Sequence, residues 1–356
     1  MHMADALVSP AVAVTMYAAS AAAAGVSLVQ LHKEETAAPE LAKKKLPTMA
    51  VMSALVFAGQ MINYTIPGTG SSGHLCGGML LSAILGPWAG FLSMIVILAI
   101  QALFFADGGL LALGANVWNM AFYGCFVGYF LIYRPLMQGR LLAGKGRTKL
   151  VLASVLGCVV TLQLGALSVV VETSLSGITA LPFGAFAALM QPIHLAIGLV
   201  EGGITAAVLL FVYQTRPELL QCASAGAKNR CSRRAALAIL AAAALVIGGG
   251  LSLLASSNPD GLEWSLFGNE EAGYSANMGL DEEAYGAESA AAEKAAAVQE
   301  KTSLLPDYNF DGSDSAAGTS VSGLVGCALV AALAAIISLA GRAARKRSGK
   351  KQASAG

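Results

Sequence analysis

Long apolar stretches separated by short polar connectors run along most of the chain. They occupy residues 7–31, 46–66, 75–106, 110–133, 150–171, 185–213, 235–256 and 319–341. Most of them reach the length of about 20 apolar residues that a transmembrane helix needs. Hydrophobic residues make up 56% of the chain and charged residues 12%, whereas about 25% of residues are charged in typical soluble proteins. The pattern predicts an all-α protein that crosses a membrane several times.

The stretch 75–106 is too long for one crossing. As a single α-helix it would extend about 48 Å, whereas the hydrocarbon core of a bilayer is about 30 Å thick. Gly86-Pro87 interrupts it near the middle, and proline breaks a helix because it lacks an N–H donor and clashes with the preceding turn. We therefore expect two segments here, with the first one short and packed inside protein instead of against lipid.

The charged residues predict how the chain is oriented in the membrane. Basic residues form four clusters: four in 33–45, five in 134–149, five in 216–234 and six from residue 342 onward. The segment 257–318 instead holds thirteen acidic residues and two lysines. Because basic residues are enriched in cytoplasmic loops, we expect the clusters and the C-terminus on the cytoplasmic side, and the N-terminus and acidic segment on the outer side. This arrangement requires one stretch to cross twice or to re-enter the membrane, and 75–106 is the candidate.

These features divide the chain into four parts. We predict a seven-span bundle over 1–213, a basic cytoplasmic linker over 214–234, a module of two spans around an acidic extracytoplasmic loop over 235–341, and a basic cytoplasmic tail over 342–356. Within the acidic loop, residues 288–301 favour a helix by composition, and we expect that helix to be exposed. The six cysteines show no CxxC spacing, so we expect buried or free thiols instead of disulfides.

Glycines and alanines recur at a spacing of four residues, as in Gly124-x3-Gly128 and Gly198-x3-Gly202. Ala18, Ala22 and Gly25 place further small residues in the first span. Such spacing lets helix backbones approach closely within a membrane. We expect these residues to serve packing within the chain, and contact with a partner subunit is the alternative.

The first residues, Met1-His2-Met3, carry the most distinctive candidate chemistry. The α-amine of Met1, the backbone nitrogen of His2 and the near nitrogen of the His2 ring can close two fused chelate rings around one metal ion. A planar set of nitrogen ligands favours Ni²⁺ or Cu²⁺. We expect Met1 to be retained because its removal favours a small second residue, and we expect no cleavable signal peptide because residues 1–7 lack a basic segment. An ordinary extracellular terminus is the alternative.

Other polar residues are candidates for the same site. His74 ends a glycine-rich, flexible loop on the predicted side of His2 and would supply a fourth nitrogen if that loop folds inward. We expect Asp5 to cap the first span or orient the His2 ring, and Asn63 to hydrogen-bond the His74 loop. A turn and a helix cap would satisfy Asp107.

His194 and Glu201 lie on one helical face with Gly198, because residues spaced by four and seven positions line up along a helix. Ionisable residues inside a span are costly and usually face the bundle interior. We expect a structural hydrogen-bond network between His194 and Glu201. A role in metal transit or around the metal site is the alternative.

Several motifs together resemble a known transporter family. They are Met1-His2-Met3-Ala-Asp-Ala-Leu with Pro10, Ser72-Gly-His74-Leu-Cys-Gly-Gly78, Leu85-Gly-Pro-Trp-Ala, Gln101-Ala-Leu-Phe, Asp107-Gly-Gly-Leu, Leu113-Gly-Ala-Asn116, Asn119-Met and His194-x3-Gly198-x2-Glu201-Gly-x-Ile-Thr205. Through them, 1–213 resembles the substrate-specific components of cobalt and nickel energy-coupling-factor transporters, the CbiM/NikM family. Through Ser257-Asn-Pro-Asp-Gly-Leu-Glu263-Trp264, 235–341 looks like the family's small companion subunit with its PDGLE-type domain. The chain therefore resembles the versions in which both are fused.

The resemblance implies a site, a substrate and partners. The metal would be held by the Met1 amine, the His2 backbone and ring nitrogens, and His74. As polar residues that surround this site or serve the structure, we ourselves expect Asp5, Asn63, Ser72, Asp107, His194 and Glu201. Ni²⁺ or Co²⁺ would be the transported substrate, with no organic cofactor, in a process linked to cobalamin biosynthesis. A transmembrane coupling subunit and cytoplasmic ATPase subunits would be the partners, in the inner cell membrane.

We therefore expect a transporter component that is not an enzyme and does not bind nucleic acid. Hydrolytic motifs such as HExxH and GxSxG do not occur in the sequence. One alternative is an integral-membrane metalloenzyme, which needs an open coordination position and a general base. A second alternative is a membrane metal sensor whose acidic loop binds a partner. Because 235–341 contains no histidine, we expect this module to assist transport without contributing metal ligands.

Overall fold

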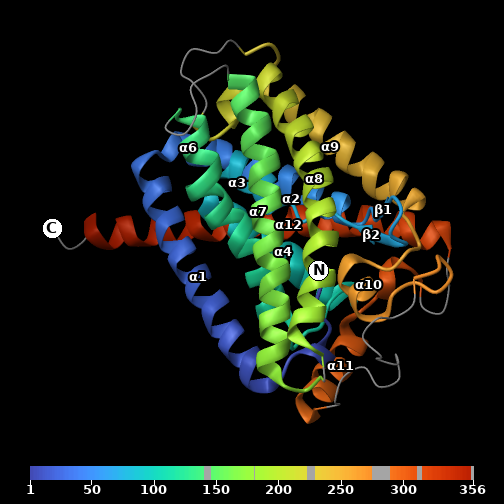
Figure 1. Ribbon diagram of the computed structural model, residues 1–356. Coiled ribbons are helices and arrows are strands. Elements are labelled where there is room, and N and C mark those ends of the chain that lie inside the picture. The colour runs from blue at the N-terminus through green and yellow to red at the C-terminus, as the bar shows by residue number, and fades with distance from the viewer. Residues whose placement is uncertain (140–145, 180, 223–228, 275–288, 311–314, 354–356) are drawn as a thin grey trace.

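The computed structural model describes residues 1–139, 146–179, 181–222, 229–274, 289–310 and 315–353 (Figure 1). Helices dominate this part of the chain. The first unit contains η1 (Asp5–Leu7), α1 (Pro10–Ala37), α2 (Pro39–Gln60), β1 (Tyr64–Ile66), β2 (Ser71–Gly73), α3 (Gly78–Leu85), α4 (Pro87–Phe104), α5 (Leu113–Asn116), the π-helical η2 (Val117–Tyr133), α6 (Arg134–Met137), α7 (Gly146–Ser176), α8 (Phe183–Thr215) and η3 (Pro217–Leu219). The second contains α9 (Arg233–Gly249), η4 (Leu251–Leu254), α10 (Gly261–Phe267), α11 (Ala290–Thr302), η6 (Pro306–Tyr308) and α12 (Ala316–Ala353).

The interruption at Gly86-Pro87 is present in the structure. Helix α3 ends at Leu85 and α4 begins at Pro87, while Gly86 between them has φ 85° and ψ 162°, outside the helical region. All eight residues of α3 are buried. The short first half is therefore packed inside protein, as the sequence predicted.

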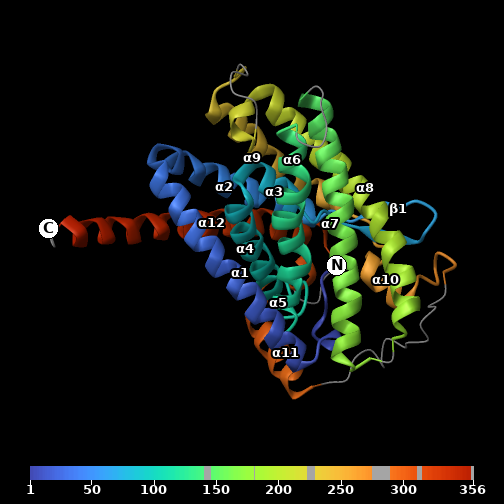
Figure 2. The same ribbon diagram turned by 60° about the vertical axis from the view of Figure 1, so that its left-hand side comes forward.

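The structure has the helices of a multi-pass membrane protein. Six helical segments of the described chain are long and apolar enough to cross a membrane: Pro10–Ala37, Pro87–Phe104, Leu113–Met137, Gly146–Ser176, Phe183–Thr215 and Ala316–Ile337. Helices α2, α3 and α9 are not among them, and α3 has only eight residues. In both views α12 runs across the direction of α7, and its C-terminal end projects beyond the other helices (Figures 1 and 2). The expected count of seven plus two crossings is not confirmed.

A small antiparallel hairpin precedes His74 where the sequence suggested a flexible loop. Strands β1 and β2 pair Tyr64 with Gly73 and Ile66 with Ser71. At its tip Gly68 and Gly70 have φ values of 75° and 68°, a region that glycine adopts at little cost. The hairpin therefore fixes the direction in which the chain enters His74.

The recurring glycines in α8 and η2 lie at helix contacts. A Cβ at Gly202 would lie 2.6 Å from the Cα of Val155 in α7, and one at Gly124 would lie 2.9 Å from the Cα of Gly78 in α3. These contacts confirm internal packing for both helices. The small residues of α1 differ, because Ala18, Ala22 and Gly25 are exposed in the structure.

The second unit packs on the first through α9 and α12, which both contact α2. Helix α11 coincides with the predicted helix over 288–301, and none of its residues is buried. All six cysteines are free, and Cys76, Cys125, Cys158 and Cys327 are buried. The expectations of an exposed helix and of unpaired cysteines are thus confirmed.

We predict that Gly124→Val lowers the stability of the protein. The added side chain meets the Gly78 backbone, which cannot move aside as a flexible side chain would, and such overpacking typically costs about 1–3 kcal/mol. Thermal unfolding in detergent would measure the effect. Gly203→Val is the matched control, because a Cβ at Gly203 meets nothing within 4 Å. Equal unfolding midpoints for the two variants would contradict the prediction.

Candidate metal centre

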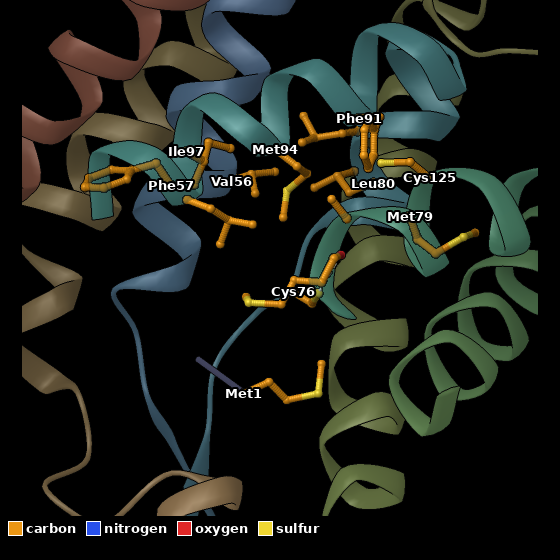
Figure 3. Close-up of a cluster of buried hydrophobic side chains, with 14 of the residues drawn as sticks. Met1, Val56, Phe57, Cys76, Met79, Leu80, Phe91, Met94, Ile97 and Cys125 are labelled. Carbon is orange, nitrogen blue, oxygen red and sulfur yellow. Dashed lines mark hydrogen bonds between the residues drawn. The ribbon is translucent and has the colours of Figure 1, made fainter. Parts of the chain in front are cut away.

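The N-terminus lies inside the molecule, and its label falls well within the outline in both views (Figures 1 and 2). Met1 as a whole residue is 6% exposed and Met3 is fully buried. Figure 3 shows Met1 in the same buried cluster as Cys76. Asn116 at the end of α5 holds the Met3 backbone on both sides: Met3 N donates to Asn116 Oδ1 at 2.7 Å, and Asn116 Nδ2 donates to Met3 O at 3.1 Å. These bonds fix the first residues relative to α5.

The α-amine of Met1 faces one carboxylate and one imidazole. It donates to Asp260 Oδ2 at 2.9 Å and lies 3.4 Å from His74 Nε2. His74 Nδ1 lies 3.1 Å from Leu75 O and can donate to it, which leaves the lone pair of the neutral ring on Nε2. The structure thus brings the amine and the proposed His74 ligand atom together.

The His2 ring stacks on the His74 ring, with 5.2 Å between their centroids and 25° between their planes. His2 Nε2 lies 3.3 Å from Gln101 Oε1, and His2 Nδ1 lies 3.3 Å from Asp107 Oδ1. The Tyr308 hydroxyl donates to Asp107 and accepts from Gln101 Nε2. Side chains from three segments therefore orient the His2 ring.

Burial sets the charges at this site. It lowers the pKa of His74 to about 3, and the positive α-amine adds to the effect. The ring is therefore neutral, which is the form that binds metals. Burial also opposes ionisation of Asp260, but the positive α-amine, which donates a hydrogen bond to it, outweighs burial and holds the pKa of this carboxyl below its ordinary value. Asp260 is thus a negative charge opposite the amine.

Glu201 on α8 holds the loop that carries His74. Its two carboxylate oxygens accept hydrogen bonds from Cys76 N at 2.8 Å and Gly77 N at 2.9 Å. These N–H groups lie at the start of α3, where a negative charge is favourable. Gly77 has φ 83°, and a Cβ there would lie 2.3 Å from Val56 Cγ1. The chain after His74 is therefore fixed by a buried carboxylate and a required glycine.

The hydrogen-bond network expected between His194 and Glu201 is not formed. The two Glu201 oxygens bind the backbone after His74, while His194 Nδ1 donates to Met190 O at 2.8 Å. Among the described residues, His194 Nε2 is buried without a hydrogen-bond partner. His194 also lines a small cavity together with Met1 and His74. The alternative, in which both residues support the region around the site, fits these contacts better.

Asp5 neither caps α1 nor orients the His2 ring, the two roles expected of it. Its Oδ1 accepts from Ala112 N at 2.9 Å, and burial raises the pKa of this carboxyl. Ser9 caps α1 instead, by accepting from Val12 N. The carboxylate beside the His2 ring is Asp107.

Asn63 and Ser72 both contact the second module. Asn63 O accepts from Ser256 N at 2.7 Å, whereas a bond from Asn63 to the His74 loop was expected. Ser72 is fully buried and donates from its hydroxyl to Asn258 O at 2.7 Å. These contacts tie the segment around the hairpin to the PDGLE-type motif.

A cavity of about 930 Å³ opens onto both histidines. Its described lining contains six carboxylates and no lysine or arginine; the carboxylates are Asp107, Asp260, Glu263, Glu270, Glu271 and Asp307. Most of these carboxylates belong to the second module. The only signal in the sequence for their place in the cavity was the overall acidity of that module. Negative charge concentrated in a cleft raises the local concentration of cations. The cavity is therefore suited to receive a metal ion.

Within the described residues, no group of three or more His, Cys, Asp and Glu side chains is placed to hold a metal ion. The site expected from the sequence combines the two histidine side chains with the Met1 amine and the His2 backbone nitrogen, which are not side-chain groups.

Comparison with known protein families identifies both units. Residues 2–219 match the family described as the cobalt uptake substrate-specific transmembrane region, CbiM. Residues 234–343 match the PDGLE domain. The boundary between the two matches lies within the predicted linker over 214–234.

Curated relatives and a solved structure agree with these matches. The chain is 34% identical to a putative fused nickel transport protein NikMN of Archaeoglobus fulgidus, over 94% of this chain and 96% of the relative. It is 36% identical to a cobalt transport protein CbiM of Sorangium cellulosum, over 49% of this chain and 76% of the relative. The crystal structure of a truncated transition metal transporter matches with a TM-score of 0.50 and 35% identity, covering 60% of this chain and 98% of that one.

We predict that one glycine added before Met1 abolishes high-affinity metal binding. The extension converts the α-amine into an amide and removes the group that lies beside His74 and Asp260. Calorimetric titration of the purified protein with Ni²⁺ would measure this loss. A glycine added after Gly356 is the control and should leave binding unchanged. Unchanged affinity of the N-terminally extended protein, with normal membrane insertion, would exclude the terminal amine as a ligand.

We also predict that His74→Ala and His194→Ala have different effects. His74→Ala removes the expected fourth nitrogen ligand and should lower the equilibrium affinity for metal. His194→Ala should mainly lower stability or transport rate, because its Nδ1 bonds within α8. Metal titration and thermal unfolding of both variants would separate the two roles. Equal loss of affinity in two normally folded variants would make His194 a metal ligand.

Proposed function

Because the chain belongs to the family of cobalt uptake substrate-specific transmembrane proteins and carries a PDGLE domain, we propose that it is the metal-capturing component of an importer for Ni²⁺ or Co²⁺. One observation carries this proposal. The nitrogen of the Met1 amine lies 3.4 Å from His74 Nε2, and the His2 ring stacks on the His74 ring. The relatives that support it are named as nickel or cobalt transport proteins. The chain is thus a transporter component and not an enzyme.

The proposed ligands are the Met1 amine, the His2 backbone and Nδ1 nitrogens, and His74 Nε2. Metal–nitrogen bonds are about 2.0–2.1 Å long, so neighbouring ligands at right angles lie about 2.9 Å apart. The amine and His74 Nε2 are 3.4 Å apart. A closing movement of roughly half an ångström would therefore bring this pair to a metal.

Entry from the outer side explains the acidic cavity. The proposed orientation places the N-terminus and the acidic segment outside, and the four basic clusters on the cytoplasmic side. The carboxylates that line the cavity would then attract divalent cations to the two histidines. Release would follow on the opposite side of the membrane.

The energy for uptake is proposed to come from separate subunits. A transmembrane coupling subunit would contact the helices of the first unit, and paired cytoplasmic ATPases would drive the cycle. This assignment rests on the family, whose description calls the matched region substrate-specific. The metal sensor alternative differs in one measurable respect, since a sensor binds metal without supporting its accumulation.

We predict ATP-dependent uptake of Ni²⁺ or Co²⁺ when the chain is reconstituted with its coupling and ATPase subunits in vesicles. Radiolabelled metal in the presence of an excess of the other, unlabelled metal would show which one is preferred. His74→Ala should abolish uptake, and an ATPase-inactive complex is the control. Normal metal binding without ATP-dependent accumulation would favour the sensor instead.

A further inference from the structure

One short turn of the PDGLE domain contacts both halves of the proposed metal site. Pro259 O accepts from Ser72 N at 2.8 Å, and Asn258 O accepts from the Ser72 hydroxyl at 2.7 Å. Ser72 lies in β2, two residues before His74. The next residue of the turn, Asp260, pairs with the Met1 amine at 2.9 Å. The turn 258–260 therefore bridges the N-terminus and the strand that leads to His74.

The Asp260 side chain is held in place by its own helix. Its Oδ1 accepts from Leu262 N at 2.8 Å and from Glu263 N at 2.9 Å, which makes it the N-cap of α10. The other oxygen, Oδ2, faces the amine and lies 3.9 Å from His74 Nε2. Because one oxygen is fixed by two backbone donors, the position of the other is fixed as well.

Helix α10 is in turn anchored to the first unit. Leu262 and Leu266 are 3% and 1% exposed, and α10 contacts α8. A Cβ at Gly261 would lie 3.0 Å from both His194 Cε1 and Ile197 Cδ1. Glycine at this position thus lets the turn approach α8 closely. The same helix carries Glu201, which holds the other side of the His74 loop.

The ion pair between Met1 and Asp260 is largely shielded from water. The two side chains are 5% and 21% exposed. An ionic group removed from water is costly unless it is paired, and its attraction to a partner is stronger than at an exposed surface. Removing the carboxylate would leave the amine without its anionic partner and without a fixed position.

We propose that Asp260 is a positioning residue of the metal-capture site, through which the PDGLE domain holds the Met1 amine beside His74. This inference rests on the proposed role of the amine as a ligand and deepens it. It assigns the second module a part in metal capture although that module contains no histidine. The module supplies charge and position, and the first unit supplies the nitrogens.

The first test needs no metal. In the full chain without added metal, the rate at which an acylating reagent modifies the Met1 amine is measured by mass spectrometry of the N-terminal peptide. Asp260→Asn keeps an oxygen acceptor for the α10 cap but removes the charge, so the amine should react several-fold faster. Glu300→Gln is the control, because Glu300 is an exposed residue of α11 that is not among the residues lining the cavity, and its rate should equal that of the unmodified chain.

The second test measures Ni²⁺ affinity by calorimetry in the same full-chain variants. We expect Asp260→Asn to lower the affinity about tenfold and Glu300→Gln to change it less than about twofold. Asp260→Glu restores the charge and should recover part of the loss. Thermal unfolding of each variant verifies that it is folded.

Two outcomes would overturn the inference. Equal acylation rates for Asp260→Asn and the unmodified chain would show that Asp260 does not hold the amine. An unchanged Ni²⁺ affinity in Asp260→Asn would show that holding the amine does not assist metal capture, and a higher affinity would show that the carboxylate competes with the metal for the amine. If the unmodified chain binds neither Ni²⁺ nor Co²⁺, the proposed function fails, while the acylation rates still decide whether Asp260 positions the amine.

Discussion

A positive charge at the start of the chain lies inside a helical bundle, and much of the surrounding structure serves to accommodate it. Such a charge is costly to bury without a partner, and Asp260 supplies that partner at 2.9 Å. The same burial keeps His74 neutral, with its pKa lowered to about 3. Asn116 fixes the backbone two residues later. The buried terminus therefore determines where α5, α10 and the β1–β2 hairpin must lie.

Much of the fold follows from local sequence signals. Length and hydropathy locate the helices, and Gly86-Pro87 marks the break between α3 and α4 because proline has a strictly local effect. The number of crossings does not follow, because a buried helix such as α3 and a spanning helix can have equally apolar sequences. The hairpin before His74 was also missed, since each of its strands has only three residues and the second, Ser71–Gly73, contains no apolar side chain.

The site was only partly predictable, because contacts between residues far apart along the chain leave no local signal in the sequence. Met1, His2 and His74 are chemically distinctive, and the structure brings them together. Asp260 is 259 residues away from Met1 along the chain, and no periodicity links two such positions. The pairing of Glu201 with the backbone at Cys76 was missed because spacing along one helix shows which side chains share a face, but not what the opposite surface offers. Long-range polar contacts require the three-dimensional structure.

The bridging turn and the hairpin that it contacts belong to one polypeptide, and this has a consequence for assembly. Linking two binding partners makes their encounter intramolecular, so its extent depends on an effective concentration set by the linker. The contacts of residues 258–260 with Ser72 add to the packing of α9 and α12 against α2, and as separate molecules the two modules would have to meet before any of these contacts could form. In the fused chain the ratio of the modules is fixed at synthesis, and their docking does not depend on how much of the protein the cell makes.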